Sequence, residues 1–167
     1  FDTADKYRNP VMVVADGMIC QMMEPVVLPE MKEYVIDYEK KPWAANGHGA
    51  KDKPSRAIIN SLYITVEELD GLNERLQATY REIEKNEVRF EAYNMENAEI
   101  IVTAFGTVAR ICKSAIDDLK EEGFNVGLIR PITLWPFPYK ALHDAAVAPG
   151  VKAVLDVELN AGQMLED

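Results

Sequence analysis

The chain has 167 residues, with 18 Lys and Arg against 28 Asp and Glu, so its formal net charge is -10. A charge of this sign would repel a phosphate backbone, which disfavours nucleic acid as a partner. No run approaches the roughly 18 apolar residues that a membrane-spanning helix needs, and we expect no membrane association. The two cysteines, Cys20 and Cys112, are far apart and isolated. They predict neither a zinc site nor an iron–sulfur cradle, and they favour a reduced, cytoplasmic setting.

The first 24 residues have the pattern of a helix followed by a buried strand. Residues 1–9 are polar and helix-compatible, Asn9 and Pro10 stop them, and the apolar run Val11–Ala15 follows before Asp16 and Gly17. A continuous apolar run between turn residues is typical of a strand covered on both faces. One strand cannot form a domain, so we predict that residues 1–24 are the last unit of a preceding domain. The start at Phe1 rather than Met supports the expectation that the sequence is a piece of a longer chain.

Residues 25–97 are predicted to be a linker that contains one long helix. From Pro25 to Asn60 the sequence has scattered prolines, glycines and charges without a regular period, which is typical of an irregular connection. Apolar residues then recur at helical spacing, which predicts an amphipathic helix over residues 65–91. Thr65 and Glu68 have the spacing of a capping box at its start.

Residues 98–167 have the clearest pattern, an alternation of strands and helices. We predict strands at about 100–105, 125–129 and 153–157, a helix that follows Gly106 and ends before Gly123, and a short helix at 139–147. The order strand, helix, strand, helix, strand with short joins predicts an α/β fold, a three-layer open parallel sheet.

Candidate sites for chemistry are scarce. Gly106 between strand and helix permits a phosphate-binding interpretation, but the segment lacks the further glycines of GxGxxG and has no GK[ST], so a plain turn is favoured. His48 and His143 have no metal-ligand partners at suitable spacing. The residues alone therefore predict no catalytic, cofactor-binding or metal-binding position.

The most informative segment is the loop that follows the second strand of this last region. Residues 130–138 hold three prolines, Trp135 and Phe137, and prolines make such a loop rigid. One interpretation is a packed crossover whose aromatics cover the sheet. The other is a contact surface at the carboxyl end of a strand, where open α/β sheets place ligands and partners.

Four blocks of sequence carry a resemblance to a known family. They are Asp16–Pro25, Ala104–Arg110, Arg130–Pro138 and Glu158–Met164. In this order they resemble the alpha-type subunit of the 2-oxoacid:ferredoxin oxidoreductases, with most similarity to the branched-chain (2-oxoisovalerate) type. Cys20, Asp156 and Leu159 depart from the family pattern, which bears on local packing more than on membership.

The resemblance implies a complete enzyme that uses thiamine diphosphate with Mg²⁺ and [4Fe-4S] clusters to convert a 2-oxoacid to an acyl-coenzyme A, with ferredoxin as electron acceptor. It also implies that residues 1–24 end a pyrimidine-binding domain, that 98–167 resemble the transketolase carboxy-terminal domain, and that the cofactors are held by missing parts or by thiamine-diphosphate-binding and iron–sulfur partner subunits. The chain is then expected to be inactive alone and to serve assembly and shaping of the shared site. The interface candidates are Gly17, Met22, Glu24, Arg130, Pro131, Trp135, Pro136 and Phe137.

Two alternatives remain at this point. A free-standing flavodoxin-like binding module would place a phosphate near Gly106. A lipoamide-linked 2-oxoacid dehydrogenase would use a related carboxy-terminal domain, although the Trp135–Phe137 block argues against it. No residue can be assigned to a substrate pocket, so the sequence does not identify the 2-oxoacid.

Overall fold

The computed structural model describes residues 1–31, 33, 41–45 and 57–161. The chain divides into two compact units, one formed by Phe1–Met23 with Arg75–Asp167 and the other by Glu24–Glu74, and each is described by itself. His48 and the end of the fourth sequence block, residues 162–164, lie outside the described residues.

A four-stranded sheet forms the centre of the first unit. Its strands are β1 (Phe90–Tyr93), β2 (Ile100–Thr103), β3 (Val126–Pro131) and β4 (Ala153–Asp156), and they are arranged in the order β1-β3-β2-β4. β2 pairs in parallel with both β3 and β4, whereas β1 pairs antiparallel with β3. The three predicted parallel strands are therefore confirmed, in a mixed sheet that is mostly parallel.

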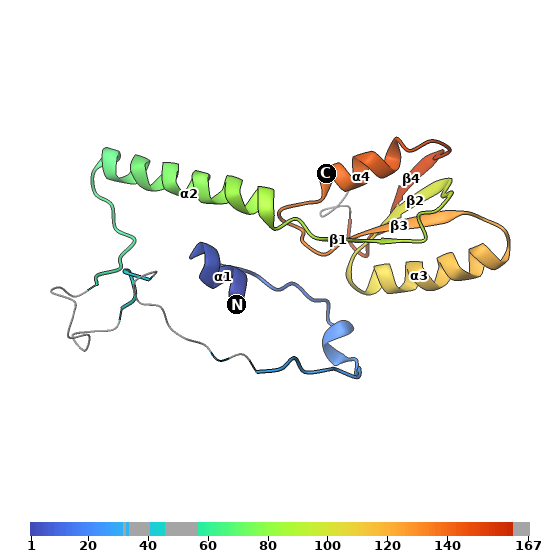
Figure 1. Ribbon diagram of the computed structural model, residues 1–167, viewed down its shortest axis with the longest axis horizontal. Helices are drawn as coiled ribbons and strands as arrows, with labels where there is room; N and C mark the ends of the chain where they lie inside the picture. Colours follow the sequence, from blue (N-terminus) through green and yellow to red (C-terminus); the bar gives the residue numbers. More distant parts are fainter. Residues whose placement is uncertain (32, 34–40, 46–56, 162–167) are drawn as a thin grey trace. The chain divides into compact units, whose positions relative to one another are not determined.

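Helices cover both faces of this sheet. Figure 1 shows α3 (Gly106–Glu121) below the strands and α4 (Tyr139–Ala146) above them. Because successive strand residues face opposite sides, Val102 and Leu128 pack in the same cluster as α3, while Ile101 and Ile129 pack with α4. β2 and β3 are buried on both faces, which explains why these two parallel strands are continuous apolar runs. We call residues 90–156 the α/β core.

The sequence prediction missed strand β1. A helix was expected over residues 65–91, but α2 (Val66–Asn86) ends four residues before Phe90, which begins β1. Phe90 lies opposite Pro131, and Tyr93 lies opposite Leu128 of β3. Pairing with a neighbouring strand therefore overrides the helical spacing of Phe90, because strand formation depends on tertiary partners more than on local pattern.

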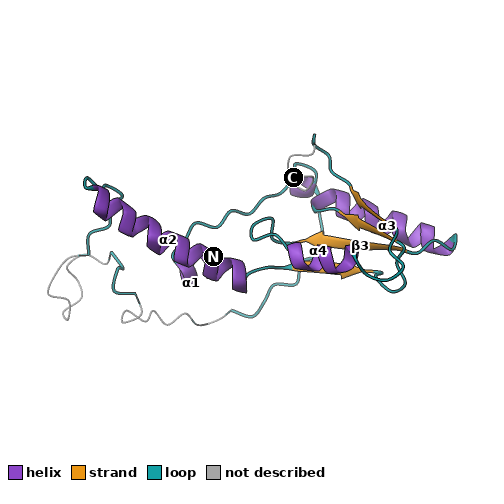
Figure 2. Cartoon of the chain, turned by 90° about the horizontal axis from the view of Figure 1, so that it is seen from above, coloured by secondary structure: helices purple, strands orange, loops and turns teal. Residues whose placement is uncertain are grey.

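The prediction of a buried strand at Val11–Ala15 is wrong for the described structure. Figure 2 shows a loop after α1 (Asp2–Tyr7), and Val13 is 91% exposed. A strand exists only through hydrogen bonds to a neighbour, and the four-stranded sheet contains no residue from this segment. A short 3₁₀ helix, η1 (Ile19–Gln21), follows it.

In the second unit, the described residues before α2 form neither helix nor strand, as expected for an irregular connection. The backbone N–H of Glu68 donates to Oγ1 of Thr65 at 3.4 Å. Thr65 therefore caps the start of α2 by forming one of the two hydrogen bonds of the predicted capping box.

Glu87, directly after α2, joins three segments of the first unit. Its Oε1 accepts hydrogen bonds from Nζ of Lys6 at 2.7 Å and from the Tyr7 hydroxyl at 2.8 Å, while Oε2 accepts from Arg89 at 3.1 Å. These donors, led by Lys6, lower the pKa of Glu87 from 4.5 to about 2. Glu87 itself is buried, and its carboxylate joins α1 to the end of α2.

The lowered pKa of Glu87 predicts a pH-dependent stability difference between the wild type and Glu87→Gln. A carboxylate with a depressed pKa stabilises the fold fully above its ordinary value of 4.5, and this contribution is lost as the pH falls towards 2. Thermal unfolding should therefore show the largest gap between the two proteins at neutral pH, and the gap should close between pH 4.5 and 2. Glu121→Gln, at an exposed position on α3, is the control. A gap that stays constant with pH would contradict the role of Glu87.

Candidate interaction surface

The loop after β3 combines buried prolines with accessible aromatic side chains. Pro131, Pro136 and Pro138 are buried, and the bond between Trp135 and Pro136 is cis. Trp135 is 53% exposed and Phe137 is half-buried. The prolines thus belong to the packing of the α/β core, whereas Trp135 remains accessible from outside.

Hydrogen bonds fix this loop to the segment before β1. The backbone N–H groups of Ile132 and Thr133 donate to the carbonyl of Arg89 at 3.0 and 3.1 Å. The N–H of Arg89 donates to Oγ1 of Thr133 at 2.9 Å, and that hydroxyl donates to the carbonyl of Pro136 at 2.8 Å. A loop held at several points presents its side chains in a defined geometry, and binding then costs less conformational entropy.

Trp135 has one aromatic neighbour within the first unit. Its ring meets Tyr80 of α2 edge to face, with ring centroids 5.8 Å apart and an angle of 87° between the planes. An edge-to-face pair is a favourable aromatic arrangement. The contact orients the indole and leaves about half of Trp135 exposed.

Arg130 has a partner inside the α/β core. Its Nε donates to Oε2 of Glu91 at 2.7 Å, from the position opposite Glu91 in the β1–β3 pairing. Lys113 of α3 forms an ion pair with the other oxygen of Glu91, and Lys113 and Arg130, in that order, lower the pKa of Glu91. The pair joins edge strand β1 to β3, so Arg130 has a structural function in addition to any contact with a partner.

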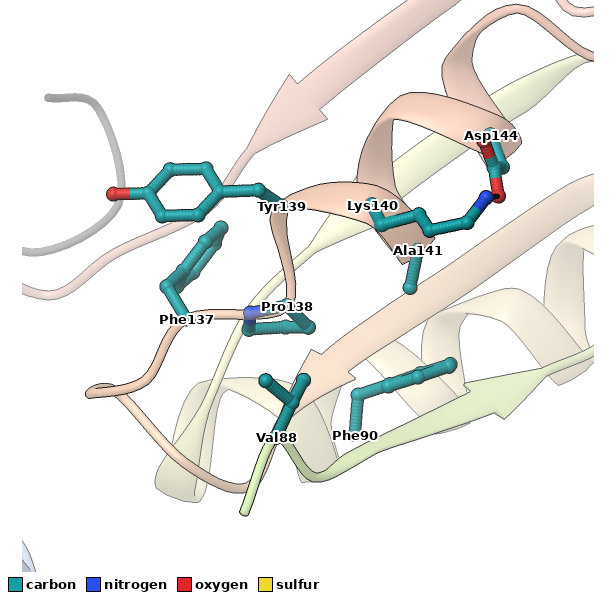
Figure 3. Close-up of a pocket in the computed structure, with 8 residues that line it drawn as sticks. All are labelled: Val88, Phe90, Phe137, Pro138, Tyr139, Lys140, Ala141 and Asp144. Carbon is teal, nitrogen blue, oxygen red and sulfur yellow. Dashed lines mark hydrogen bonds and ion pairs between the residues drawn. The ribbon is translucent and has the colours of Figure 1, made fainter. Parts of the chain in front are cut away.

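An apolar cavity of about 530 Å³ opens beside β1, next to the same loop. Figure 3 shows its lining, which comprises Val88, Phe90, Phe137, Pro138, Tyr139, Lys140, Ala141 and Asp144. The rings of Phe137 and Tyr139 are 4.8 Å apart, and Tyr139 is 75% exposed. Lys140 and Asp144 form an ion pair on its charged side. Phe137 lines this cavity two residues after the exposed Trp135, so accessible apolar groups lie both on the loop and in the cavity beside it.

Sequence reasoning missed Val88, Phe90 and Tyr139. Val88 and Phe90 fell within the helix expected over 65–91, and the strand pairing that brings Phe90 to the cavity has no local signal. Tyr139 could have been found, because it continues the aromatic run of Trp135 and Phe137.

The remaining interface candidates, Gly17, Met22 and Glu24, are exposed. Met22 is 47% exposed and directly follows η1. Among the described residues of the first unit, no hydrogen bond or ring contact joins Gly17 or Met22 to the Trp135 loop. Hydrogen bonds and ring contacts therefore do not join Gly17 and Met22 with the Trp135 loop into one site.

The turn at Gly106 already holds an anionic group of the chain. Oδ2 of Asp16 accepts hydrogen bonds from the backbone N–H of Thr107 at 3.2 Å and from its hydroxyl at 2.7 Å. A bound phosphate would need the same amino end of α3. The plain-turn interpretation of Gly106 is therefore favoured over a phosphate site.

Within the described residues, no group of three His, Cys, Asp or Glu side chains is arranged to hold a metal ion. Cys20 is exposed, and burial raises the pKa of the half-buried Cys112. His143 is exposed beside Asp144. No helix among the described residues is long and apolar enough to cross a membrane.

Comparison with known proteins identifies the family. Residues 98–167 match the family model "Pyruvate:ferredoxin oxidoreductase core domain II". The whole chain is 41% identical to ketoisovalerate oxidoreductase subunit VorB of Methanothermobacter thermautotrophicus, of which it covers 46%. The chain belongs to the 2-oxoacid:ferredoxin oxidoreductases. The resemblance seen in the four sequence blocks is thus confirmed, and the flavodoxin-like and lipoamide-linked alternatives are set aside.

Two further relatives are informative. The 2-oxoglutarate synthase subunit KorA of Methanocaldococcus jannaschii is 30% identical over 98% of the chain and 48% of KorA. A solved 2-oxoglutarate:ferredoxin oxidoreductase from Magnetococcus marinus has a similar fold, with a TM-score of 0.52 and 18% identity over 66% of this chain and 19% of that chain. The chain spans about half the length of the curated relatives that it matches.

The Glu91–Arg130 pair predicts a measurable coupling in a double-mutant cycle. Glu91→Ala, Arg130→Ala and the double variant should give a coupling of about 0.5–1 kcal/mol in chemical unfolding, because both side chains are only about one-third exposed but still screened by solvent. Lys140 and Asp144, which are 88% and 56% exposed, form the comparison pair and should couple more weakly. Equal coupling in both pairs would show that Glu91 does not join β1 to the core.

Proposed function

We propose that this chain is part of the alpha-type subunit of an oxidoreductase that converts a branched-chain 2-oxoacid, such as 2-oxoisovalerate, to its acyl-coenzyme A and reduces ferredoxin. The observation that carries the proposal is the 41% identity with the ketoisovalerate subunit over the whole chain. Identity is lower, 30% and 31%, with subunits named for 2-oxoglutarate and pyruvate. This difference favours a branched-chain substrate.

Thiamine diphosphate supplies the carbanion chemistry of such enzymes, and iron–sulfur clusters carry the electrons. The described residues do not fit a role in holding either group. They contain no metal-ligand cluster, their two cysteines are isolated, and the amino end of α3 holds Asp16. We therefore assign thiamine diphosphate, Mg²⁺ and the [4Fe-4S] clusters to other parts of the enzyme. We assign no catalytic step to this chain alone.

The chain then serves assembly and shaping of a shared active site in a cytoplasmic enzyme. In this proposal residues 1–24 end the pyrimidine-binding domain, and the linker contains α2. The domain like the transketolase carboxy-terminal domain begins at β1 rather than at residue 98, because β1 pairs with β3. The family match over 98–167 covers the other three strands of this domain.

The surface proposed to contact the thiamine-diphosphate-binding and iron–sulfur subunits is the face with Trp135 and the apolar cavity. It combines an aromatic side chain held by a rigid loop with apolar lining next to an open strand edge. Buried aromatic anchors in pockets contribute much of the free energy of protein association. The other interface candidates of the loop would hold this surface in place, namely Arg130, Pro131, Pro136 and Phe137.

The proposed substrate predicts the outcome of a direct assay. The complete enzyme that contains this chain should reduce ferredoxin with 2-oxoisovalerate and coenzyme A at a higher kcat/KM than with pyruvate or 2-oxoglutarate. The 167-residue chain alone should be inactive and should bind no thiamine diphosphate in calorimetry. A preference for pyruvate or 2-oxoglutarate would refute the branched-chain assignment.

Trp135→Ala tests the proposed contact surface. Because Trp135 is 53% exposed in the chain, its removal should change the melting temperature little. Loss of an aromatic anchor typically costs about 2 kcal/mol of association, equivalent to about 30-fold weaker binding of the partner subunits.

Phe124→Ala supplies the matched control, because Phe124 is a similarly exposed aromatic residue, 56% accessible, that follows α3. Co-purification and calorimetry should show weaker assembly for Trp135→Ala only. A large loss of melting temperature with intact assembly would mean that Trp135 serves folding instead.

A further inference from the structure

The carboxyl ends of β2 and β4 form the place where an open α/β sheet ordinarily binds a ligand. From β2 the chain passes through α3 to β3 on one side, and from β3 through α4 to β4 on the other side of β2. The connections therefore diverge between β2 and β4. Ligands of open α/β sheets bind at such a divergence, and the amino end of a helix there favours an anion.

Asp16 takes the position of that anion. Its Oδ2 accepts from the N–H and the hydroxyl of Thr107, a residue 91 positions later that is 5% exposed. The N-cap residue of α3, Phe105, provides no side-chain cap, so Asp16 supplies the acceptor that a local Ser, Thr or Asp usually provides.

The same carboxylate also organises its own segment. Oδ1 of Asp16 accepts the N–H of Ile19 at 2.8 Å, at the start of η1. One oxygen therefore holds the turn into η1 and the other holds α3. The N–H of Ile19 and then the Thr107 hydroxyl are the main groups that lower the pKa of Asp16, so the acid is charged at neutral pH.

Gly106 allows this approach in two ways. Its φ is +59°, a left-handed conformation that is costly for residues with a Cβ. A Cβ at this position would also lie 3.3 Å from Oδ2 of Asp16, which is a tight contact. The single glycine thus serves the turn and leaves room for the carboxylate.

We propose that Asp16 is a positioning residue that fastens residues 16–23 to the amino end of α3 and keeps other anions out of this end. The fastened segment carries exposed methionines, with Met18 60%, Met22 47% and Met23 99% accessible. We expect these methionines to contact a partner subunit, and this expectation rests on the proposed function. The fastening itself depends only on Asp16 and Thr107.

Hydrogen exchange of the full chain, followed by mass spectrometry at neutral pH, tests the proposal. Asp16→Ala and Thr107→Val should speed exchange in residues 16–23 about tenfold or more, because hydrogen bonds to a charged acceptor are lost. Thr107→Ser keeps the hydroxyl and should behave like the wild type. Asp118→Ala removes an exposed carboxylate from the same helix and should leave these residues unchanged.

Added formate gives a second readout that a purely structural defect would not produce. In Asp16→Ala, formate can enter the vacated amino end of α3 and should slow exchange at the Thr107 amide, whereas the wild type should not respond. Exchange in β2 and β3 reports in the same experiment whether each variant is folded.

The proposal is overturned if folded Asp16→Ala exchanges in residues 16–23 within twofold of the wild type, or if formate protects both proteins equally. Exchange is measured without partner subunits. If the Trp135→Ala experiment shows no effect on binding of partner subunits, the proposed contact surface fails, but the result of this exchange test does not change.

Discussion

The parallel pairing of β2 with both β3 and β4 is the constraint on which the rest of the first unit depends. β2 has hydrogen-bonded neighbours on both edges and helices over both faces, so Ile101 is 1% and Thr103 2% exposed. This central position fixes the start of α3 at Gly106 and the carboxyl edge to which Asp16 binds. It also fixes β3, whose continuation is the Trp135 loop. The candidate contact surface and the Asp16 contact thus both follow from the strand order.

The parallel strands and the helices of the α/β core could be predicted from sequence because their signals are local. Apolar runs that end at Gly106 and at the Arg130–Pro131 pair indicate buried parallel strands. Gly123, with φ of +91°, lies just after α3 and marks the end of the helix. The same local reading failed at Phe90 and at Val11–Ala15. Phe90 has helical spacing but pairs with Pro131, and the apolar run after Pro10 has no strand partner among the described residues.

The candidate sites divide in the same way. Trp135 and Phe137 were found because a proline-rich aromatic loop is visible within nine residues of sequence. The cavity beside β1 was not found, since it needs Phe90 and Tyr139 to meet through the fold. The contact of Asp16 with Thr107 joins residues 91 positions apart, and neither residue type is unusual where it stands. No pattern within the sequence pairs them.

The attachment of residues 1–23 to the α/β core differs in kind from the packing inside the core. Two carboxylates accept hydrogen bonds across this junction, Glu87 from Lys6 and Tyr7, and Asp16 from Thr107. Between them the chain contributes little apolar burial, since Met12 and Val13 are 85% and 91% exposed. Each contact has one exposed partner, Lys6 or Asp16, and such polar contacts contribute far less free energy than a buried apolar core. Local opening of residues 1–23 should therefore cost less than opening of the sheet. A segment held in this way can dock against a partner while the α/β core stays intact.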